Sequence, residues 1–365
     1  MLNNIKSKYI CQIIFKNVKT KQKLNILKHN KKTLNRLNIT KEDFKVYAQL
    51  KLEEFNKTFP IYINDYEIKI LRLSLKNIKN ENIKDLAKIS FYELRELYLN
   101  TSKISDINDF KNYNYKNLEI LDISSNQISD IKVLEKVEFK TLEILNLGFN
   151  YISDIKVLQN SNFKELKELY LSGNNILNIE ALQNVDFKKL KLLDLSNNKI
   201  LDIKILQNVD FKILKQLYLN NNDISDIKVL RNVKFEDLEI LNLNSNKIED
   251  INVLEYVNFK ELKKLFLRAN QISDINVLGN VKFEKLDKLD LSQNQIINVN
   301  ILDKVNFKEL KKINLSENKI SDIKALYKIK FEKLEILNIR NNQINNQEKY
   351  YLIKNLKPKI KLIQI

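Results

Sequence analysis

The chain has 365 residues and a formal net charge of +17, and 44% of its residues are hydrophobic. It holds only three Gly, two Pro, one Cys (Cys11) and one His (His29), which excludes a disulfide framework and a zinc cluster and leaves Cys–His or Ser–His catalysis only through His29. Because nucleotide-binding enzymes also need glycine-rich phosphate loops, the composition predicts a non-enzymatic protein without a metal or a cofactor.

The first 60 residues are basic, with 14 Lys or Arg against four Asp or Glu. Ile10, Ile13 and Ile14 share a helical face, and the stretch from Thr40 to Asp43 matches a helix capping box. We therefore expect residues 1–60 to form a small helical module that caps the region after it or binds a second protein. An organelle-targeting segment, or a contact with nucleic acid or lipid, is the remaining alternative for this stretch.

The sequence shows no secretory signal and no run of the ~18 apolar residues that a membrane helix needs. We therefore expect a cytoplasmic protein, with the nucleus as the alternative location. Two matches to the glycosylation sequon, at Asn38 and Asn100, are expected to stay unmodified for the same reason.

A repeat of 24 residues dominates the rest of the chain. Units begin at Leu94 and at every 24th residue from there to Leu334, and a degenerate unit begins at Ile70. The template is L-x-x-L-x-L-x-x-N-x-I-x-D-I-x-x-L-x-x-V-x-F-x-x, and its positions are numbered 1 to 24 from the first Leu. This pattern resembles the leucine-rich repeat family, and the units are similar to those of its internalin and intracellular phosphatase-regulator types.

Each position of the template has a physical interpretation. Apolar residues at positions 4 and 6 alternate with variable ones, which predicts a short strand with one buried face. The Asn at position 9 is expected to bond the turn and the adjacent unit, because a buried amide offers both donors and an acceptor. The apolar residues that follow, at helical spacing, predict a short helix or helical turn that completes the core.

Position 13 is acidic in most units, and the carboxylates could suggest a metal or acid–base array. Asp occupies it at Asp106, Asp130, Asp154, Asp202, Asp226, Asp250, Asp274 and Asp322. Each Asp directly precedes the helical segment, and Asn replaces it at Asn178 and Asn298. Since Asn caps helices as well as Asp does but is a poor cation ligand, we interpret this position as a helix N-cap.

The predicted fold class is therefore α/β: a leucine-rich-repeat solenoid with a curved parallel β-sheet on its concave face and short helices or helical turns on its convex face. Residues 1–60 form the helical N-terminal region, and residues 61–345 form the array. Residues 346–365 are similar to the C-terminal cap of this repeat type and predict a helix, Pro358 and a final strand.

The variable positions 3, 5, 7, 8 and 10 are expected to form the concave surface, which binds partners in repeat proteins. Aromatic residues gather there in the middle units and basic residues in the later ones. The candidate partner-binding residues are Tyr98, Phe149, Tyr151, Tyr170, Tyr218, Phe266, Lys264, Arg268, Lys288, Lys312 and Arg340. We expect the aromatic residues to hold a protein partner and the basic residues to attract an acidic segment of it.

Two alternatives keep the scaffold but change the partner. Residues 1–40 are faintly similar to an F-box, without its leading Leu-Pro and closing Trp, which would make the chain a substrate adaptor of a ubiquitin ligase. The repeat type would also suit a phosphatase regulatory subunit. A nucleic-acid ligand is disfavoured because the repeats are nearly charge-balanced and carry no recognised motif.

Overall fold

The structure, a computed structural model, describes residues 72–75, 78, 80–86, 93–113, 115–329, 331–356 and 360–365. The predictions for residues 1–60, including the helical module and the F-box similarity, lie outside these residues. The same holds for Pro358 and for the domain boundary at residue 60, and these stay predictions.

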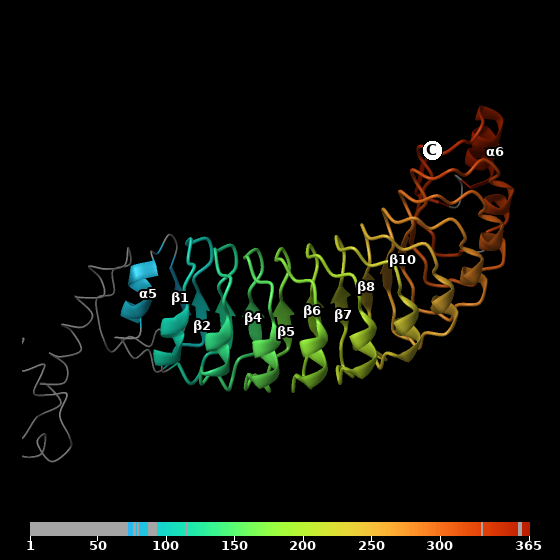
Figure 1. Cartoon of the computed structure of the whole chain (residues 1–365). Coiled ribbons are helices and arrows are strands. Elements are labelled where there is room, and N and C mark those ends of the chain that lie inside the picture. The colour runs from blue at the N-terminus through green and yellow to red at the C-terminus, as the bar shows by residue number, and fades with distance from the viewer. Residues whose placement is uncertain are drawn as a thin grey trace, which may run out of the picture.

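One sheet of thirteen parallel strands runs through the described residues, and its strands follow one another in chain order (Figure 1). The strands are β1 Arg72–Ser74, β2 Glu96–Tyr98, β3 Ile120–Asp122, β4 Ile144–Asn146, β5 Glu168–Tyr170, β6 Leu192–Asp194, β7 Gln216–Tyr218, β8 Ile240–Asn242, β9 Lys264–Phe266, β10 Lys288–Asp290, β11 Lys312–Asn314, β12 Ile336–Asn338 and β13 Leu362–Gln364. From β1 to β12 each residue pairs with its counterpart 24 residues away, as Leu193 does with Leu217. Equal unit length therefore fixes the register of the sheet from β1 to β12.

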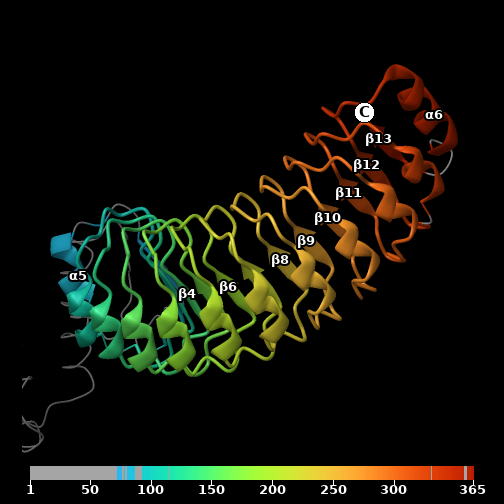
Figure 2. The ribbon, with the colours of Figure 1, turned by 45° about the vertical axis from the view of Figure 1, so that its right-hand side comes forward.

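The convex segments are 3-10 helices of four or five residues, where the sequence allowed either a short helix or a helical turn. They are η2 Asn108–Asn112, η3 Lys132–Glu135, η4 Lys156–Asn160, η5 Glu180–Asn184, η6 Lys204–Asn208, η7 Lys228–Asn232, η8 Asn252–Glu255, η9 Asn276–Gly279, η10 Asn300–Asp303 and η11 Lys324–Lys328. A segment this short makes only one turn, so it closes i→i+3 bonds such as Leu158 N–H to Ile155 O (3.0 Å). In Figure 2 the strands β8–β13 line the inner side of the bend and the helical turns line its outer side.

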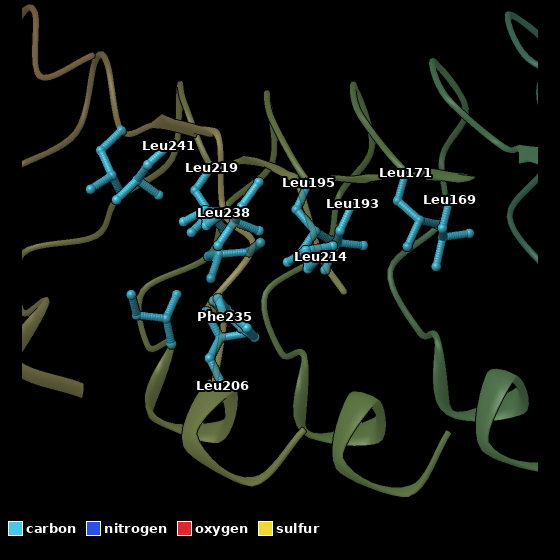
Figure 3. Packing of buried hydrophobic residues seen from close by; sticks show 14 of the residues in the cluster. Leu169, Leu171, Leu193, Leu195, Leu206, Leu214, Leu219, Phe235, Leu238 and Leu241 are labelled. Carbon is cyan, nitrogen blue, oxygen red and sulfur yellow. The ribbon is translucent and has the colours of Figure 1, made fainter. Parts of the chain in front are cut away.

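The core lies between these two layers. Leu side chains at positions 1, 4 and 6, Ile at 11 and 14, Leu at 17 and Phe at 22 are buried in nearly every unit. Figure 3 shows Leu195, Leu214 and Phe235 among the side chains that fill the space between strands and helical turns. The α/β solenoid predicted from the repeat is therefore confirmed.

The buried Asn at position 9 joins neighbouring units, as the sequence predicts. The side-chain amide of Asn222 donates to the carbonyl oxygens of Leu195 (3.0 Å), Leu219 (3.0 Å) and Asn220 (3.4 Å). Its Oδ1 atom accepts a hydrogen bond from the backbone N–H of Ile200 at 3.0 Å. One side chain thus satisfies four backbone groups that neither the sheet nor a helix reaches.

The Asp at position 13 caps the helical turn, as predicted, but the turn begins one residue later than predicted, so the Asp precedes the N-cap residue. The carboxylate of Asp226 accepts the backbone N–H of Lys228 (2.9 Å), the first residue of η7. The helix cap itself is Ile227, whose side chain makes no capping bond. Asn178 and Asn298 make the same bond as the Asp residues do. No cluster of metal-binding side chains occurs in the part of the chain that the structure describes.

Position 8 adopts a left-handed backbone conformation, which the sequence does not reveal. The φ angle there lies between 53° and 57° in all ten units that carry a residue other than Gly, including Phe149 (55°). The backbone N–H of this position still donates to the next unit, as Asn221 N–H does to Asn244 O (2.9 Å). The inter-unit hydrogen bonds therefore impose a strained turn on whatever residue stands there.

Two α-helices stand at the ends of the described array. Near the first strands, α5 (Asn80–Leu86) is held by the hydroxyls of Tyr113 and Tyr115, which donate to its carbonyl oxygens at 2.7 and 2.8 Å. At the other end, α6 (Asn346–Leu356) buries Leu352 and Leu356 and precedes β13, which is the predicted order of a helix and a final strand. None of the described helices is both long and apolar enough to cross a membrane.

Candidate functional site

The side chains at positions 3 and 5 of each strand lie on the face of the sheet away from the core, where most of them are half-buried. Position 7 differs from the prediction. Its small residues, such as Ser172 and Ser196, are buried, and Arg268 and Arg340 are the exposed exceptions. We call the face formed by positions 3 and 5, together with these two arginines, the strand face.

Four of the predicted aromatic residues lie in one row of the strand face. Tyr98, Tyr170, Tyr218 and Phe266 all occupy position 5, on β2, β5, β7 and β9. In the paired register, Asp194 lies between Tyr170 and Tyr218. The middle of the sheet therefore presents an interrupted row of large rings.

Polar neighbours hold the tyrosine rings in place. The hydroxyl of Tyr170 donates to Glu168 at 2.7 Å, and that of Tyr218 donates to Gln216 at 2.8 Å. Burial, and then the hydrogen bond and charge of Glu168, raise the pKa of Tyr170 above its usual value. Burial and the charge of Asp194 raise the pKa of Tyr218 in the same direction. Both hydroxyls thus stay protonated and keep the rings fixed along their strands.

Two further aromatic residues lie on the turn after β4. The side chains of Phe149 and Tyr151 are 59% and 58% exposed, and no other unit carries aromatic residues at positions 8 and 10. The ring of Phe149 covers Gly173, where an added Cβ atom would meet it at 2.6 Å. These two rings therefore stand at the edge of the strand face and not in the row of position 5.

Sequence reasoning missed exposed aliphatic residues beside this turn. Leu177 and Leu201 occupy position 12 of the next two units and are 56% and 58% exposed. The signal was available, because position 12 is Ser in six of the other units. They extend the exposed apolar edge that begins at Phe149 and Tyr151.

The predicted basic residues occupy the strand face of the later units. Lys264, Lys288 and Lys312 lie side by side at position 3 of β9, β10 and β11. The ammonium group of Lys288 lies 4.8 Å from the centre of the Phe266 ring, a cation–π contact. Arg268 and Arg340, both exposed, stand at the ends of β9 and β12. The basic residues thus begin where the aromatic row ends.

Acidic residues occupy the other half of the strand face, and sequence reasoning did not assign them a role. They are Glu96, Asp122, Glu168 and Asp194, on β2, β3, β5 and β6. Asp122 and Asp194 accept the backbone N–H of the residue two positions on, each at 2.9 Å. Their side chains are therefore fixed on the surface.

Comparison with known protein families identifies the same repeats. A family described as leucine-rich repeats in two copies matches residues 116–160 and 214–256, and a second leucine-rich repeat family matches residues 140–200. No curated protein matches the chain.

Solved structures share the fold over most of the chain. The internalin InlF of Listeria monocytogenes is 26% identical, with a TM-score of 0.68 over 87% of this chain and 89% of that one. A leucine-rich-repeat protein of Leptospira interrogans is 22% identical, with a TM-score of 0.61 over 77% and 74% of the two chains. The plant peptide hormone receptor RGFR1, solved in complex with RGF2, is 21% identical, with a TM-score of 0.56 over 75% and 43%. The 24-residue units and the parallel sheet, together with these likenesses, identify the chain as a leucine-rich-repeat protein whose fold is similar to that of the internalin InlF.

Proposed function

We propose that the chain is a non-enzymatic scaffold that holds a protein partner on the strand face of its sheet. The observation that carries the proposal is the row of Tyr170, Tyr218 and Phe266 at position 5 of the strand face. Large aromatic side chains provide most of the binding free energy in many protein interfaces. The leucine-rich-repeat fold is also one that displays such a surface along its whole length.

The rings suit this role because they are already ordered. Their hydrogen bonds to Glu168 and Gln216 keep Tyr170 and Tyr218 in one orientation before a partner arrives. A partner that covers them therefore loses little side-chain entropy, which favours tight binding. Phe149 and Tyr151 would extend the contact to the edge of the sheet.

The basic end of the strand face suggests that the partner also carries an acidic segment. Among the described residues, Lys264, Lys288, Lys312, Arg268 and Arg340 form no ion pair. An acidic segment of the partner would neutralise them and would also be attracted at a distance. We propose that this segment lies over the basic end of the strand face, beginning at β9.

We propose a scaffold without catalysis because the acidic side chains of the strand face form hydrogen bonds with nearby groups. Asp122 and Asp194 accept hydrogen bonds from the backbone N–H groups of Ser124 and Ser196, and Glu168 accepts one from the hydroxyl of Tyr170. These three carboxylates are thus already used in local contacts. The structure of RGFR1 with RGF2 provides a precedent for a ligand-binding protein with this fold.

The test is a triple substitution that removes the rings but keeps the fold. The chain itself carries Asn at position 5 in Asn146, Asn242, Asn314 and Asn338, so Y170N/Y218N/F266N is compatible with the sheet. Y256N/Y350N/Y351N is the matched control, since these three Tyr residues are exposed on η8's end and on α6. In affinity capture from native lysate, the first variant should lose the partner and the control should retain it.

Retention of the partner by Y170N/Y218N/F266N, with an unchanged circular dichroism spectrum, would contradict the proposed site. The identity of the captured protein separates the alternatives, since a ubiquitin-ligase adaptor and a phosphatase subunit would bring down different complexes.

A further inference from the structure

Charges on the strand face are segregated by sign. From β2 to β8 its charged residues are Glu96, Asp122, Glu168 and Asp194, all acidic. From β9 to β12 they are Lys264, Arg268, Lys288, Lys312 and Arg340, with Asp290 as the one acidic residue. The two halves therefore have opposite net charge.

Charges just outside the strand face follow a different rule. There, opposite charges at equivalent positions of neighbouring units pair with one another. The pairs include Arg95–Glu119, Lys167–Glu143, Lys189–Glu165, Lys215–Glu239, Lys263–Glu239, Lys285–Glu261 and Lys333–Glu309. At these positions, charges of opposite sign in neighbouring units thus neutralise each other along the solenoid.

Most charges on the strand face are not neutralised by a neighbouring unit in this way. Lys264, Lys288 and Lys312 are direct neighbours in the paired register, and like charges opposite each other on adjacent strands destabilise a sheet. Within the described residues, Asp122, Glu168 and Asp194 have no basic side chain within ion-pair distance, and Glu96 alone is paired, with Arg72 of β1 at 3.4 Å. A ligand with the opposite order of charges would relieve both halves at once.

We infer that the partner contributes a polypeptide segment that crosses the strands and is itself divided into two charged blocks. Its basic block lies over β3–β6, its apolar centre over Tyr218 and Phe266, and its acidic block over β9–β11. This inference rests on the proposed function and adds the charge order of the bound segment.

The dimensions fit one extended segment. From β3 to β11 the sheet spans eight strand spacings of about 4.8 Å, or about 38 Å. An extended chain covers that length with about 12 residues. A nucleic acid does not fit this surface, because its uniform negative charge would oppose the acidic half.

Two synthetic peptides of about 14 residues test the inference. Both contain equal numbers of Lys and Glu and the same apolar residues, but one carries Lys and Glu in separate blocks around an apolar centre and the other alternates them. Fluorescence anisotropy at low ionic strength measures their binding to the full chain. The block peptide should bind about tenfold more tightly or better, since only its charge order matches the face.

Neutralising variants locate the two contacts. D122N/E168Q/D194N and K264Q/K288Q/K312Q retain side-chain size, and both Asn and Gln already occur at these positions, in Asn146 and Gln216. Each variant should lose most of the preference for the block peptide. K156Q/K228Q/K324Q changes the net charge by the same amount as K264Q/K288Q/K312Q but lies on the exposed starts of convex helical turns, so it should keep the preference.

Equal binding of the two peptides, no binding of either, or tighter binding of a single-stranded oligonucleotide would overturn the inference. The proposed function fails separately, when Y170N/Y218N/F266N still captures the partner. A chain that passes the capture test but does not distinguish the two peptides therefore keeps its site and loses only the charge order.

Discussion

Asn222 shows at the scale of one residue how neighbouring units are joined. Its four hydrogen bonds reach the backbone of its own unit and of the unit before it. Replacing a buried amide leaves those backbone groups without partners, and each such loss costs about 1–3 kcal/mol. The Asn ladder is thus a structural feature of the repeat and not a binding site.

We predict that N222A lowers the free energy of unfolding by about 2–4 kcal/mol, because several buried backbone groups lose their partner together. Urea denaturation followed by circular dichroism measures the change. Asn232, exposed at the end of η7, provides the control, and N232A should be nearly neutral. A similar stability for N222A and N232A would show that the ladder is not needed.

Phe149 combines an exposed aromatic side chain with the left-handed backbone that the repeat imposes at position 8. Its φ angle is 55°, and Asn, which tolerates this conformation, occupies the same position as Asn197, Asn221 and Asn341. We predict that F149N stabilises the chain by about 0.5–1 kcal/mol by relieving this strain, although the contact with Gly173 is lost. Under the proposed function the same variant should bind the partner less tightly. Thermal denaturation and capture from lysate measure the two effects, and a destabilised F149N would contradict the strain argument.

At the scale of the element, the sequence predicts more about the strands than about the convex side. Alternation of apolar residues locates the strands of the repeat units, because burial of one face requires that period. The convex segments form 3-10 helices because the unit leaves room for a single turn, and the spacing of apolar residues does not distinguish that from one turn of α-helix. Because the spacing of apolar residues does not fix where this short turn begins, the sequence also places the helix cap at the Asp of position 13, one residue too early.

Ion pairs between neighbouring units contribute at this scale, and Glu239 is the clearest example. Hydrogen bonds from Lys263 (2.7 Å) and Lys215 (2.9 Å) lower the pKa of Glu239 below its usual value. A carboxyl with a lowered folded-state pKa stabilises the fold above its unfolded pKa, and this contribution is lost as the pH falls through the folded pKa.

We therefore predict that E239Q is less stable than the native chain at pH 7, by no more than about 1 kcal/mol because the pair is partly exposed. The difference should shrink once the pH falls below about 4, where Glu is protonated in the unfolded chain. Urea midpoints at the two pH values test this, with E284Q as a control at an exposed Glu that forms no ion pair among the described residues. A difference that grows towards acid pH would contradict the assignment.

At the scale of the whole molecule, equal units make the array modular. Deleting residues 190–213 removes one unit of 24 residues, with β6 and η6, and brings β5 next to β7 in the same register. We predict a folded, cooperatively unfolding chain, because stability in such arrays is nearly a sum of unit and interface contributions. Deleting residues 202–213 alone breaks the register and should prevent folding. Loss of folding in both deletions, seen by circular dichroism, would argue against modularity.

The candidate site was predicted in part. The repeat shows which positions face away from the core, so the row of Tyr170, Tyr218 and Phe266 and the basic row could be found from the sequence. The acidic half is harder to find from the sequence, because its residues, such as Asp122 and Asp194, stand singly in separate units. Its continuity depends on which charges pair, and the sequence does not give these contacts.

The most direct test of the strand face as the binding surface is site-specific photo-cross-linking in native lysate. A photoreactive side chain at Asn242 stands between Tyr218 and Phe266 in the paired register, whereas one at Asn252 stands on the convex η8. We predict a covalent adduct with the partner from position 242 and none from position 252. An adduct from position 252 alone would place the partner on the convex side and contradict the proposed function.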